Sequence, residues 1–214
     1  MKNNIIADTF KWLFIGLLVC FGISYYTSSS VTTFTNVYTL FGSNTIYVYI
    51  VLELALCIIL GIFITKMSPL VAKIAYILYT AITGLTLSGL FMIYTKSSIA
   101  IVFLVTAVIF GIFAIIGKTT KMDLSKWSVY LFIALLAIIV LEIVNIFLMS
   151  NTLDIILCVV VIILFAAYTA YDINRLIKSS DEIPNKGIFF AFQLFLDFIN
   201  IFIKLLRLFG ERKD

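Results

Sequence analysis

The sequence predicts an all-α integral membrane protein with seven transmembrane helices. Of its 214 residues, 63% are hydrophobic and 12% are charged, and the mean hydropathy is +1.18. A soluble domain is about half apolar and about a quarter charged. A membrane-spanning helix needs about 20 residues, so the chain has room for roughly six to eight spans and no separate soluble domain. The spans must be helices because lipid offers the backbone no hydrogen-bond partners.

Seven apolar runs, each ended by charged or Ser/Thr-rich residues, define these helices within one membrane domain, residues 1–214. The helices are expected at 10–26, 43–65, 70–94, 97–118, 126–149, 153–177 and 187–209.

Polar segments and a proline delimit the first helices. The first run ends at the Ser/Thr-rich segment 28–35, which is expected to form an outer loop. Lys66 ends the second run, and Pro69 precedes the third, where its missing N–H group breaks no helical hydrogen bond. Lys96 separates the third run from the fourth.

Polar and charged segments also delimit the later helices. The segment 118–126 separates the fourth run from the fifth, and the segment 149–152 separates the fifth from the sixth. The segment 178–186, which contains Pro184, separates the last two runs. The charged tail at 211–214 follows the last helix.

Loop charge predicts the orientation. Basic residues concentrate at the N-terminus and in the breaks after helices two, four and six, whereas the other breaks hold only Lys96. By the positive-inside rule, the N-terminus is therefore cytoplasmic. Seven full spans would place a basic tail outside, and a re-entrant last segment would return it to the cytoplasm. The seven-span interpretation is preferred because the first helices usually set the topology.

The composition excludes several classes of site. The chain has no histidine, which excludes Ser-His-Asp catalysis, HExxH zinc sites and haem ligation by imidazole. The three cysteines lie singly in apolar runs without CxxC spacing, as is typical of small buried hydrophobes. The sequence has no basic stripe with interleaved aromatics of the kind that binds nucleic acid. We therefore expect no enzyme activity, no cofactor and no nucleic-acid partner.

Four carboxylic acids fall within predicted spans, namely Glu53, Glu142, Asp172 and Asp197. An isolated charge there costs at least about 2.5 kcal/mol, so each is expected to face a cavity or a partner. The alternative is a neutral carboxyl group that hydrogen-bonds to a neighbouring helix. This alternative is strongest for Glu142, which has Asn145 one turn further on.

The last helix carries a continuous polar stripe. Its polar residues are spaced by four, three, four and three positions, which places them on one helical face. They are Gln193, Asp197, Asn200, Lys204 and Arg207. Such a stripe lines either a water-accessible path or a polar packing interface. Phe198 and Ile201 lie off the stripe and are expected to contact other helices.

Asp172 and Asp197 are expected to meet across the hairpin of the last two helices. At 1.5 Å per residue, both lie roughly 9 to 15 Å from the loop that joins these helices. Two carboxylates in contact cannot both ionise cheaply, so the pair is expected to share one proton. In a chain without histidine, this pair is the available pH switch.

Four segments resemble the Bax inhibitor family in a compact bacterial form. They are LTLSGLF at 85–91, KTTKMDLS at 118–125, LFAAYTAYDINRLI at 164–177 and LFLDFINIFIKLLRLFG at 194–210. The resemblance extends from the second helix to the last. It implies a seven-helix fold in which the C-terminal helix is central and wrapped by the other six. It also implies a pH-sensitive calcium leak in the plasma (inner) membrane of a bacterium.

The resemblance implies roles for individual residues. The family's paired aspartates match Asp172 and Asp197, and its acidic residue in the second helix matches Glu53. Carboxylates are hard oxygen ligands that suit calcium, so these three residues are candidate calcium ligands. The expected ion pathway comprises Glu53, Gln193, Asn200 and Glu142.

One part of the family pattern is missing. The bacterial calcium-leak members carry an arginine cluster at the cytoplasmic end of the second helix, and one of these arginines latches the aspartate of the sixth helix in the closed state. This chain has FITKMSPL at 63–70, where only Lys66 offers a cation, and a lysine lacks the bidentate fork of arginine. Lys66 and Arg175 are the candidate latch cations for an ionised Asp172.

We therefore expect a passive, pH-gated pathway whose partners are calcium, protons and the lipid bilayer. A proton-coupled transporter, which also needs midplane carboxylates, is one alternative, although inverted repeats and broken helices are not evident. A non-conducting regulatory membrane protein is the other. An intramembrane aspartyl protease is disfavoured because the GxGD and PAL signatures are missing.

Overall fold

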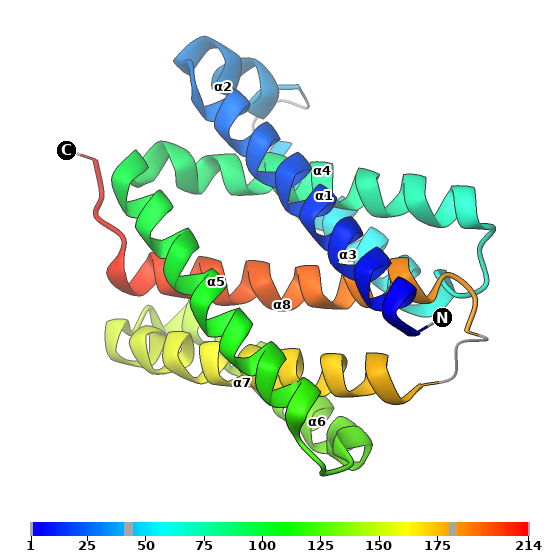
Figure 1. Cartoon of the computed structure of the whole chain (residues 1–214). Helices are drawn as coiled ribbons and strands as arrows, with labels where there is room; N and C mark the ends of the chain where they lie inside the picture. The colour runs from blue at the N-terminus through cyan, green and yellow to red at the C-terminus, as the bar shows by residue number, and fades with distance from the viewer. Residues whose placement is uncertain (1, 41–44, 180–182, 214) are drawn as a thin grey trace. The chain divides into compact units, whose positions relative to one another are not determined.

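The computed structural model describes residues 2–40, 45–179 and 183–213 (Figure 1). Its elements are α1 (Lys2–Ser28), α2 (Val31–Tyr38), α3 (Thr45–Phe63), α4 (Pro69–Ile93), α5 (Lys96–Thr119), the 3₁₀ helix η2 (Leu124–Trp127), α6 (Ser128–Leu148), α7 (Asn151–Lys178) and α8 (Lys186–Phe209). No strand forms in these three ranges. The predicted all-α class and the seven predicted helices are confirmed.

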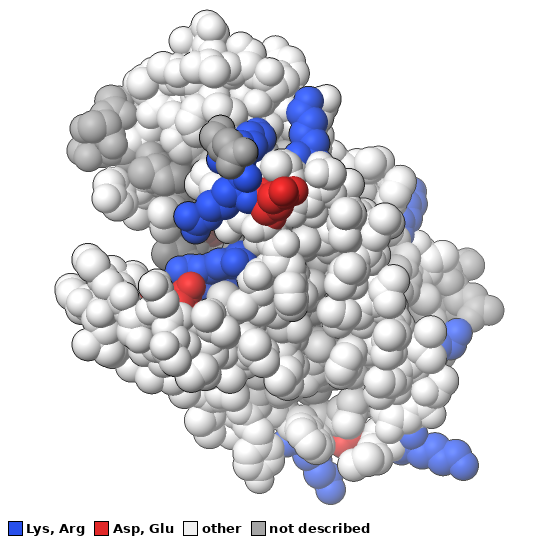
Figure 2. Space-filling view, turned by 90° about the vertical axis from the view of Figure 1, so that its left-hand side faces the viewer, with Lys and Arg blue, Asp and Glu red and all other residues white. Residues whose placement is uncertain are grey.

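Within the described residues, six helices are long and apolar enough to cross a membrane, namely α1, α4, α5, α6, α7 and α8. The described part of α3 contains a shorter apolar helix, 47–63, and residues 43–44 of the predicted second helix lie outside the described residues. Figure 2 shows a surface on which uncharged side chains cover most of the view and charged ones gather in a few places. The chain is a multi-pass membrane protein.

The segment 28–35 is helical over most of its length, and the prediction of a loop there is wrong. Residues 31–38 form α2, although threonine and valine have low helix propensity. One tertiary contact and one contact within the helix offset this propensity. The Tyr38 hydroxyl donates a hydrogen bond to the Leu85 carbonyl of α4 at 3.0 Å, and the Tyr38 ring stacks on Phe34, one turn earlier in α2, with a centroid distance of 4.2 Å.

The first helix begins at Lys2 instead of at residue 10. Asp8, which the sequence places in a polar tail, therefore lies within α1. Its carboxylate approaches the backbone of Gly187 at the start of α8, where a Cβ atom would overlap it. The polar residues before the apolar run are part of the helix, because a residue can be helical without being apolar enough to face lipid.

The described chain divides into two compact units, and α8 contributes to both. The first unit contains α1 to α4, α8 up to Phe195, and the tail from Arg212. The second contains α5 to α7 and α8 from Leu196 onward. Within the best apolar window of each span, 72% of α8 is buried, compared with 11–39% in the other five. This burial agrees with the interior position predicted for the last helix.

In the first unit, α4 packs against both α1 and α8. The Ser24 hydroxyl donates to the Gly84 carbonyl at 2.8 Å, and the Tyr76 hydroxyl donates to the Trp12 carbonyl at 3.0 Å. The Tyr76 ring also meets Phe195 of α8 edge to face, with a centroid distance of 6.2 Å. These contacts fix the N-terminal half of α8 against α4.

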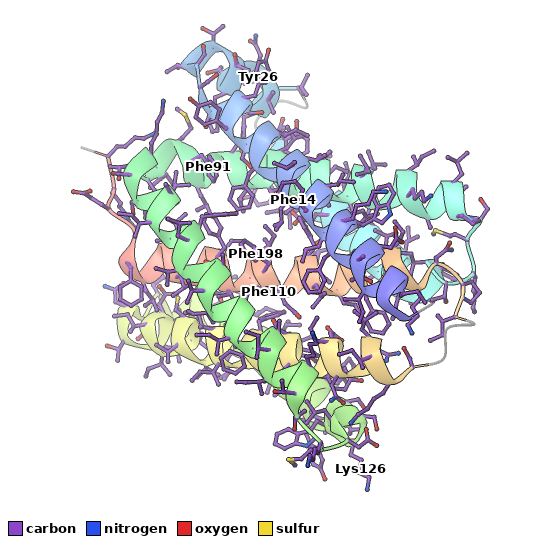
Figure 3. The ribbon with its side chains drawn as sticks, viewed as in Figure 1. Phe14, Tyr26, Phe91, Phe110, Lys126 and Phe198 are labelled. Atoms are coloured by element: carbon purple, nitrogen blue, oxygen red, sulfur yellow. The ribbon has the colours of Figure 1, made fainter. Side chains whose placement is uncertain are left out.

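In the second unit, α5 packs against α8 through aromatic rings. Phe198 lies 5.3 Å from Phe103 and 5.7 Å from Phe110, measured between ring centroids (Figure 3). The predicted contact of Phe198 with another helix is thereby confirmed, and Ile201 is fully buried. A second apolar cluster joins α6 to α7 and comprises Leu131, Ile138, Val161, Leu164 and Tyr171.

Within the first unit, the residues that precede α8 and those that follow it contact opposite ends of α4. Asn185, immediately before α8, donates hydrogen bonds to the Ile64 and Met67 carbonyls in the α3–α4 turn, both at 2.8 Å. After α8, the Lys213 N–H group donates to the Ile93 carbonyl at the end of α4 at 2.8 Å. A re-entrant α8 would return the tail to the α3–α4 turn. The contacts therefore favour a seventh complete span, with the basic tail beside the α4–α5 turn.

This arrangement predicts which segments share a side of the membrane. We expect single cysteines at Lys96 and in the C-terminal tail to react with an impermeant reagent from the same side, and one at Lys121 to react from the opposite side. Each single cysteine would be introduced into a variant that lacks the three native cysteines, and labelling would be measured in sealed vesicles of known orientation. Labelling of the tail together with Lys121 would contradict a complete seventh span.

Close packing of α5 on α7 predicts a stability difference between two glycines of α5. A Cβ atom at Gly117 would overlap the backbone of Ala170, whereas one at Gly111 would meet nothing within 4 Å. We expect Gly117→Ala to lower the unfolding free energy by about 1–3 kcal/mol through overpacking. Gly111→Ala should be neutral or slightly stabilising, because alanine favours helix by about 1 kcal/mol. Thermal unfolding in detergent measures both, and equal midpoints would refute the close crossing.

Candidate functional site

The second unit contains a pair of buried aspartates. Asp172 of α7 and Asp197 of α8 are each 3% exposed, and their carboxyl groups lie within electrostatic reach of each other. Among the described residues, Asp172 Oδ1 and Asp197 Oδ2 are buried without a hydrogen-bond partner. A bound proton or cation would supply that partner. The structure thus buries both aspartates in one unit, and their direct contact stays a prediction.

Three further side chains of α7 contribute to this site. Thr169, one turn before Asp172, donates its hydroxyl hydrogen to the Phe165 carbonyl at 2.9 Å and lies close enough to the Asp197 carboxyl group to act on it. Tyr168 interacts electrostatically with both aspartates. Arg175, three residues after Asp172, carries the positive charge that acts on it. Arg175 therefore has the location expected of a latch cation.

Lys66, the other candidate latch cation, belongs to the first unit. It lies in the α3–α4 turn, and its ammonium group is 5.7 Å from the centroid of the Phe63 ring. A cation over an aromatic face is a favourable arrangement in itself. The assignment of Lys66 to a latch stays a prediction.

Asn174 fixes the end of α7 close to the aspartate pair. Its side chain is 3% exposed, and its amide donates to the Gly117 carbonyl of α5 at 3.1 Å. Its side-chain oxygen accepts from the Leu124 N–H group of η2 at 3.3 Å. One side chain therefore connects three elements, two residues after Asp172. Sequence reasoning did not single out Asn174, although a polar residue in the YDIN segment was the available signal.

The α5–α6 turn beside Asn174 is ordered by its own polar contacts. Asp123 accepts a hydrogen bond from the Ser125 N–H group at 3.1 Å, and Lys178 donates to the Met122 carbonyl at 2.6 Å. Hydrogen bonds from the side chain and backbone of Ser125 hold the pKa of the Asp123 carboxyl below its usual range. The turn therefore provides a fixed anchor for the end of α7.

Glu53 lies in the first unit, between α3 and α4. Its Oε1 accepts from the Thr83 hydroxyl at 2.9 Å, and its Oε2 accepts from the Thr86 hydroxyl at 2.8 Å. These donors stabilise a polar group that a transmembrane helix would otherwise expose to lipid. Thr86 belongs to the LTLSGLF segment, and its partnership with Glu53 was not predicted.

The calcium-ligand prediction for Asp172, Asp197 and Glu53 remains open. Across residues 2–40, 45–179 and 183–213, no group of three or more His, Cys, Asp or Glu side chains is placed to hold a metal ion. The two aspartates nevertheless supply adjacent oxygen ligands, which is chemistry suited to a cation in passage.

The polar stripe of α8 has different partners along its length. Gln193 Oε1 is buried without a hydrogen-bond partner in the described chain, and the Asn200 amide donates to the Leu196 carbonyl of its own helix at 2.8 Å. Lys204 pairs with Glu142 of α6, and Arg207 pairs with Asp154 of α7. The stripe therefore consists of uncharged amides and an acid followed by two ion pairs.

Glu142 has a different partner from the one that the sequence suggests. Asn145, one turn further along α6, accepts a hydrogen bond from the Ser150 N–H group at 3.2 Å. Glu142 instead binds the Lys204 ammonium group of α8. A passing cation could bind Glu142, as the predicted ion pathway requires, only when this ion pair opens.

Comparison with known proteins covers almost the whole chain. The family model described as "Inhibitor of apoptosis-promoting Bax1" matches residues 2–214. Inner membrane protein YbhL of Escherichia coli strain K12 is 38% identical over 219 aligned residues, which cover 97% of this chain and 91% of YbhL. An uncharacterised protein of Borreliella burgdorferi is 33% identical, with coverage of 100% and 94%. An uncharacterised membrane protein of Streptococcus pyogenes serotype M1 is 32% identical, with coverage of 75% and 72%.

Proposed function

The chain belongs to the Bax inhibitor family, and from this premise we propose that it is a pH-sensitive passive leak for calcium and other cations in a bacterial inner membrane. The observation that supports the proposal is the burial of Asp172 on α7 and Asp197 on α8, each with a carboxyl oxygen that lacks a hydrogen-bond partner among the described residues. Buried ionisable residues within membrane spans commonly serve ion or proton pathways.

The pair acts as the proton sensor. When one proton is shared, the two carboxyl groups carry a single negative charge and hold α7 against α8. Loss of that proton places two like charges together in a low-dielectric environment, which biases the helices apart. Arg175 opposes this repulsion by pairing with an ionised Asp172. The response is expected between about pH 5 and 8, where carboxyl groups in such pairs titrate.

In this proposal the polar residues of α8 line the cation path, and the acid of α3 recruits cations within the first unit. Gln193 and Asn200 flank Asp197 on one helical face and offer amide oxygens to a cation. Glu53, with both oxygens held by threonine hydroxyls, is an ordered carboxylate that recruits cations. In this proposal the N-terminus is cytoplasmic, as the loop charges predict.

Calcium flux into proteoliposomes tests this function. The purified chain is reconstituted with an internal calcium dye, and flux is followed with the proton gradient collapsed by a protonophore. A passive leak still follows the calcium gradient, and its rate changes with the common pH on both sides. Flux that requires a proton gradient would instead indicate a proton-coupled transporter. No flux above protein-free liposomes would favour a non-conducting regulatory protein.

A further inference from the structure

An ion pair within the membrane-spanning part of the second unit has no role in the proton sensor. The Lys204 ammonium group of α8 lies 2.5 Å from Glu142 Oε1 of α6. Their side chains are 13% and 30% exposed, so both charges are partly withdrawn from the surroundings. A carboxylate in a membrane span is a site for a cation, and here the cation is part of the chain itself.

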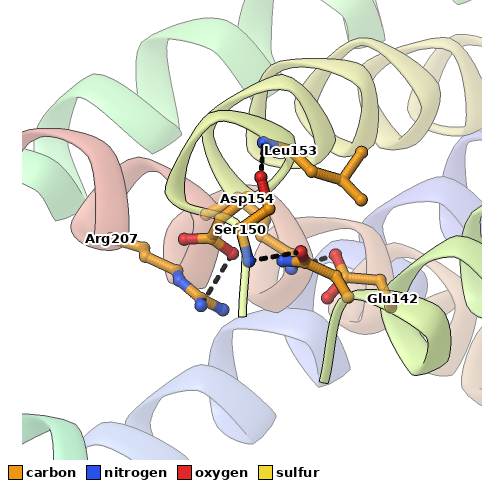
Figure 4. Close-up of polar contacts among 7 residues, drawn as sticks. Glu142, Ser150, Leu153, Asp154 and Arg207 are labelled. Carbon is orange, nitrogen blue, oxygen red and sulfur yellow. Dashed lines mark hydrogen bonds and ion pairs between the residues drawn. The ribbon is translucent and has the colours of Figure 1, made fainter. Parts of the chain in front are cut away.

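The position of Lys204 relates this ion pair to the cation path. Lys204 follows Asp197 by seven residues on the same helical face, which places it about 10 Å further along α8. A second pair, Arg207 to Asp154 at 2.7 Å, lies one turn beyond it (Figure 4). A cation that follows the stripe from Asp197 toward the C-terminal end of α8 therefore meets a fixed ammonium group before it meets water.

The α6–α7 turn near Glu142 is ordered by contacts that do not involve Lys204. At the α6–α7 turn, the Ser150 hydroxyl accepts from the Leu153 N–H group at 3.3 Å and caps α7 (Figure 4). Asn145, one turn after Glu142, binds the backbone of the same turn. All four charged groups of the two pairs act on the buried thiol of Cys158. Glu142 therefore lies in a compact charged cluster formed by α6, α7 and α8.

We propose that Glu142 forms a second cation-binding site and that the Lys204 ammonium group occupies it as a tethered competitor of mobile divalent cations. This inference rests on the proposed leak function and extends it to the C-terminal half of α8. A free cation gains access to Glu142 only when Lys204 swings away, because one carboxylate cannot neutralise both charges. Lys204 thereby limits calcium passage at a point separate from the aspartate pair.

Lys204→Met tests the proposal, because methionine keeps most of the side-chain length without the charge. We expect calcium to raise the thermal unfolding midpoint of full-length Lys204→Met more than that of the native chain, and calcium flux in proteoliposomes to rise several-fold. Lys204→Met/Glu142→Gln should lose the additional calcium stabilisation, and Lys204→Arg should behave as the native chain. Lys126→Met on η2 provides the same change of net charge at an exposed position.

The two proposals can fail separately. Equal calcium stabilisation of native and Lys204→Met protein, together with pH-dependent flux in the native chain, would overturn the role of Lys204 and leave the leak function standing. Calcium stabilisation that appears in Lys204→Met and disappears in the double variant would support the Glu142 site even if the native chain conducts no calcium. If Lys204→Met fails to fold, Lys204→Met/Glu142→Gln removes both charges of the ion pair, and its calcium flux is compared with that of the native chain. An increase supports Lys204 as the group that limits calcium passage, and no change refutes that role.

Discussion

Replacing Asp172 or Asp197 by asparagine is expected to flatten the pH dependence of calcium flux. A single shared proton changes the ionised population by at most about tenfold per pH unit, and asparagine leaves only one carboxyl group at the site. Native flux should therefore vary several-fold between about pH 5 and 8, and flux through either variant should vary little. Dye-loaded proteoliposomes measured at equal pH inside and outside provide the comparison.

Glu53→Gln is the matched control for this experiment. It also removes a carboxylate from a span, but Glu53 is only partly buried and is bound by Thr83 and Thr86 in the first unit. Its flux should fall while the pH profile keeps its shape. An unchanged pH profile in both aspartate variants would remove the sensor role from the pair and direct attention to Glu53 and Glu142.

Asn174→Ala is expected to destabilise the protein by about 2–4 kcal/mol. The substitution removes two hydrogen bonds and leaves the Gly117 carbonyl and the Leu124 N–H group without their side-chain partner. Because Asn174 follows Asp172 by two residues, release of the end of α7 should also shift the midpoint of the pH response. Thermal unfolding and the flux profile measure the two effects.

Asn145→Ala provides the comparison for Asn174→Ala. Asn145 accepts a single bond, from the Ser150 N–H group at the α6–α7 turn, and its loss should cost about 1 kcal/mol. Equal losses of unfolding free energy in the two variants would show that the contacts of Asn174 with α5 and η2 stabilise the protein no more than the single bond of Asn145.

The helices could be predicted because the membrane imposes long apolar segments that satisfy their own backbone. Their ends were less predictable. The α1 helix extends to Lys2 through residues that are too polar for a lipid-facing run, and α2 is stabilised by the hydrogen bond from Tyr38 to Leu85 of α4. That bond joins residues 47 positions apart, which local pattern does not reveal.

The interior location of Asp172 and Asp197 could be predicted because charge is rare in apolar spans and an isolated charge there needs a partner or a cavity. The side chains that contact these acidic residues could not be predicted. Contacts of Thr169 with Asp197 and of Lys204 with Glu142 depend on how each helix is rotated about its own axis. Hydropathy sets the position of a helix in the membrane but leaves that rotation to side-chain packing.

The shared proton itself is the central claim, and pH-difference infrared spectroscopy of the purified chain measures it directly. A protonated carboxyl group has a C=O stretch that is absent from a carboxylate. We predict that native protein loses the band of one buried carboxylic acid between about pH 5 and 8, and that neither Asp172→Asn nor Asp197→Asn shows this loss in that range. A band that titrates identically in native protein and in both variants, or none at all in native protein, would contradict the account.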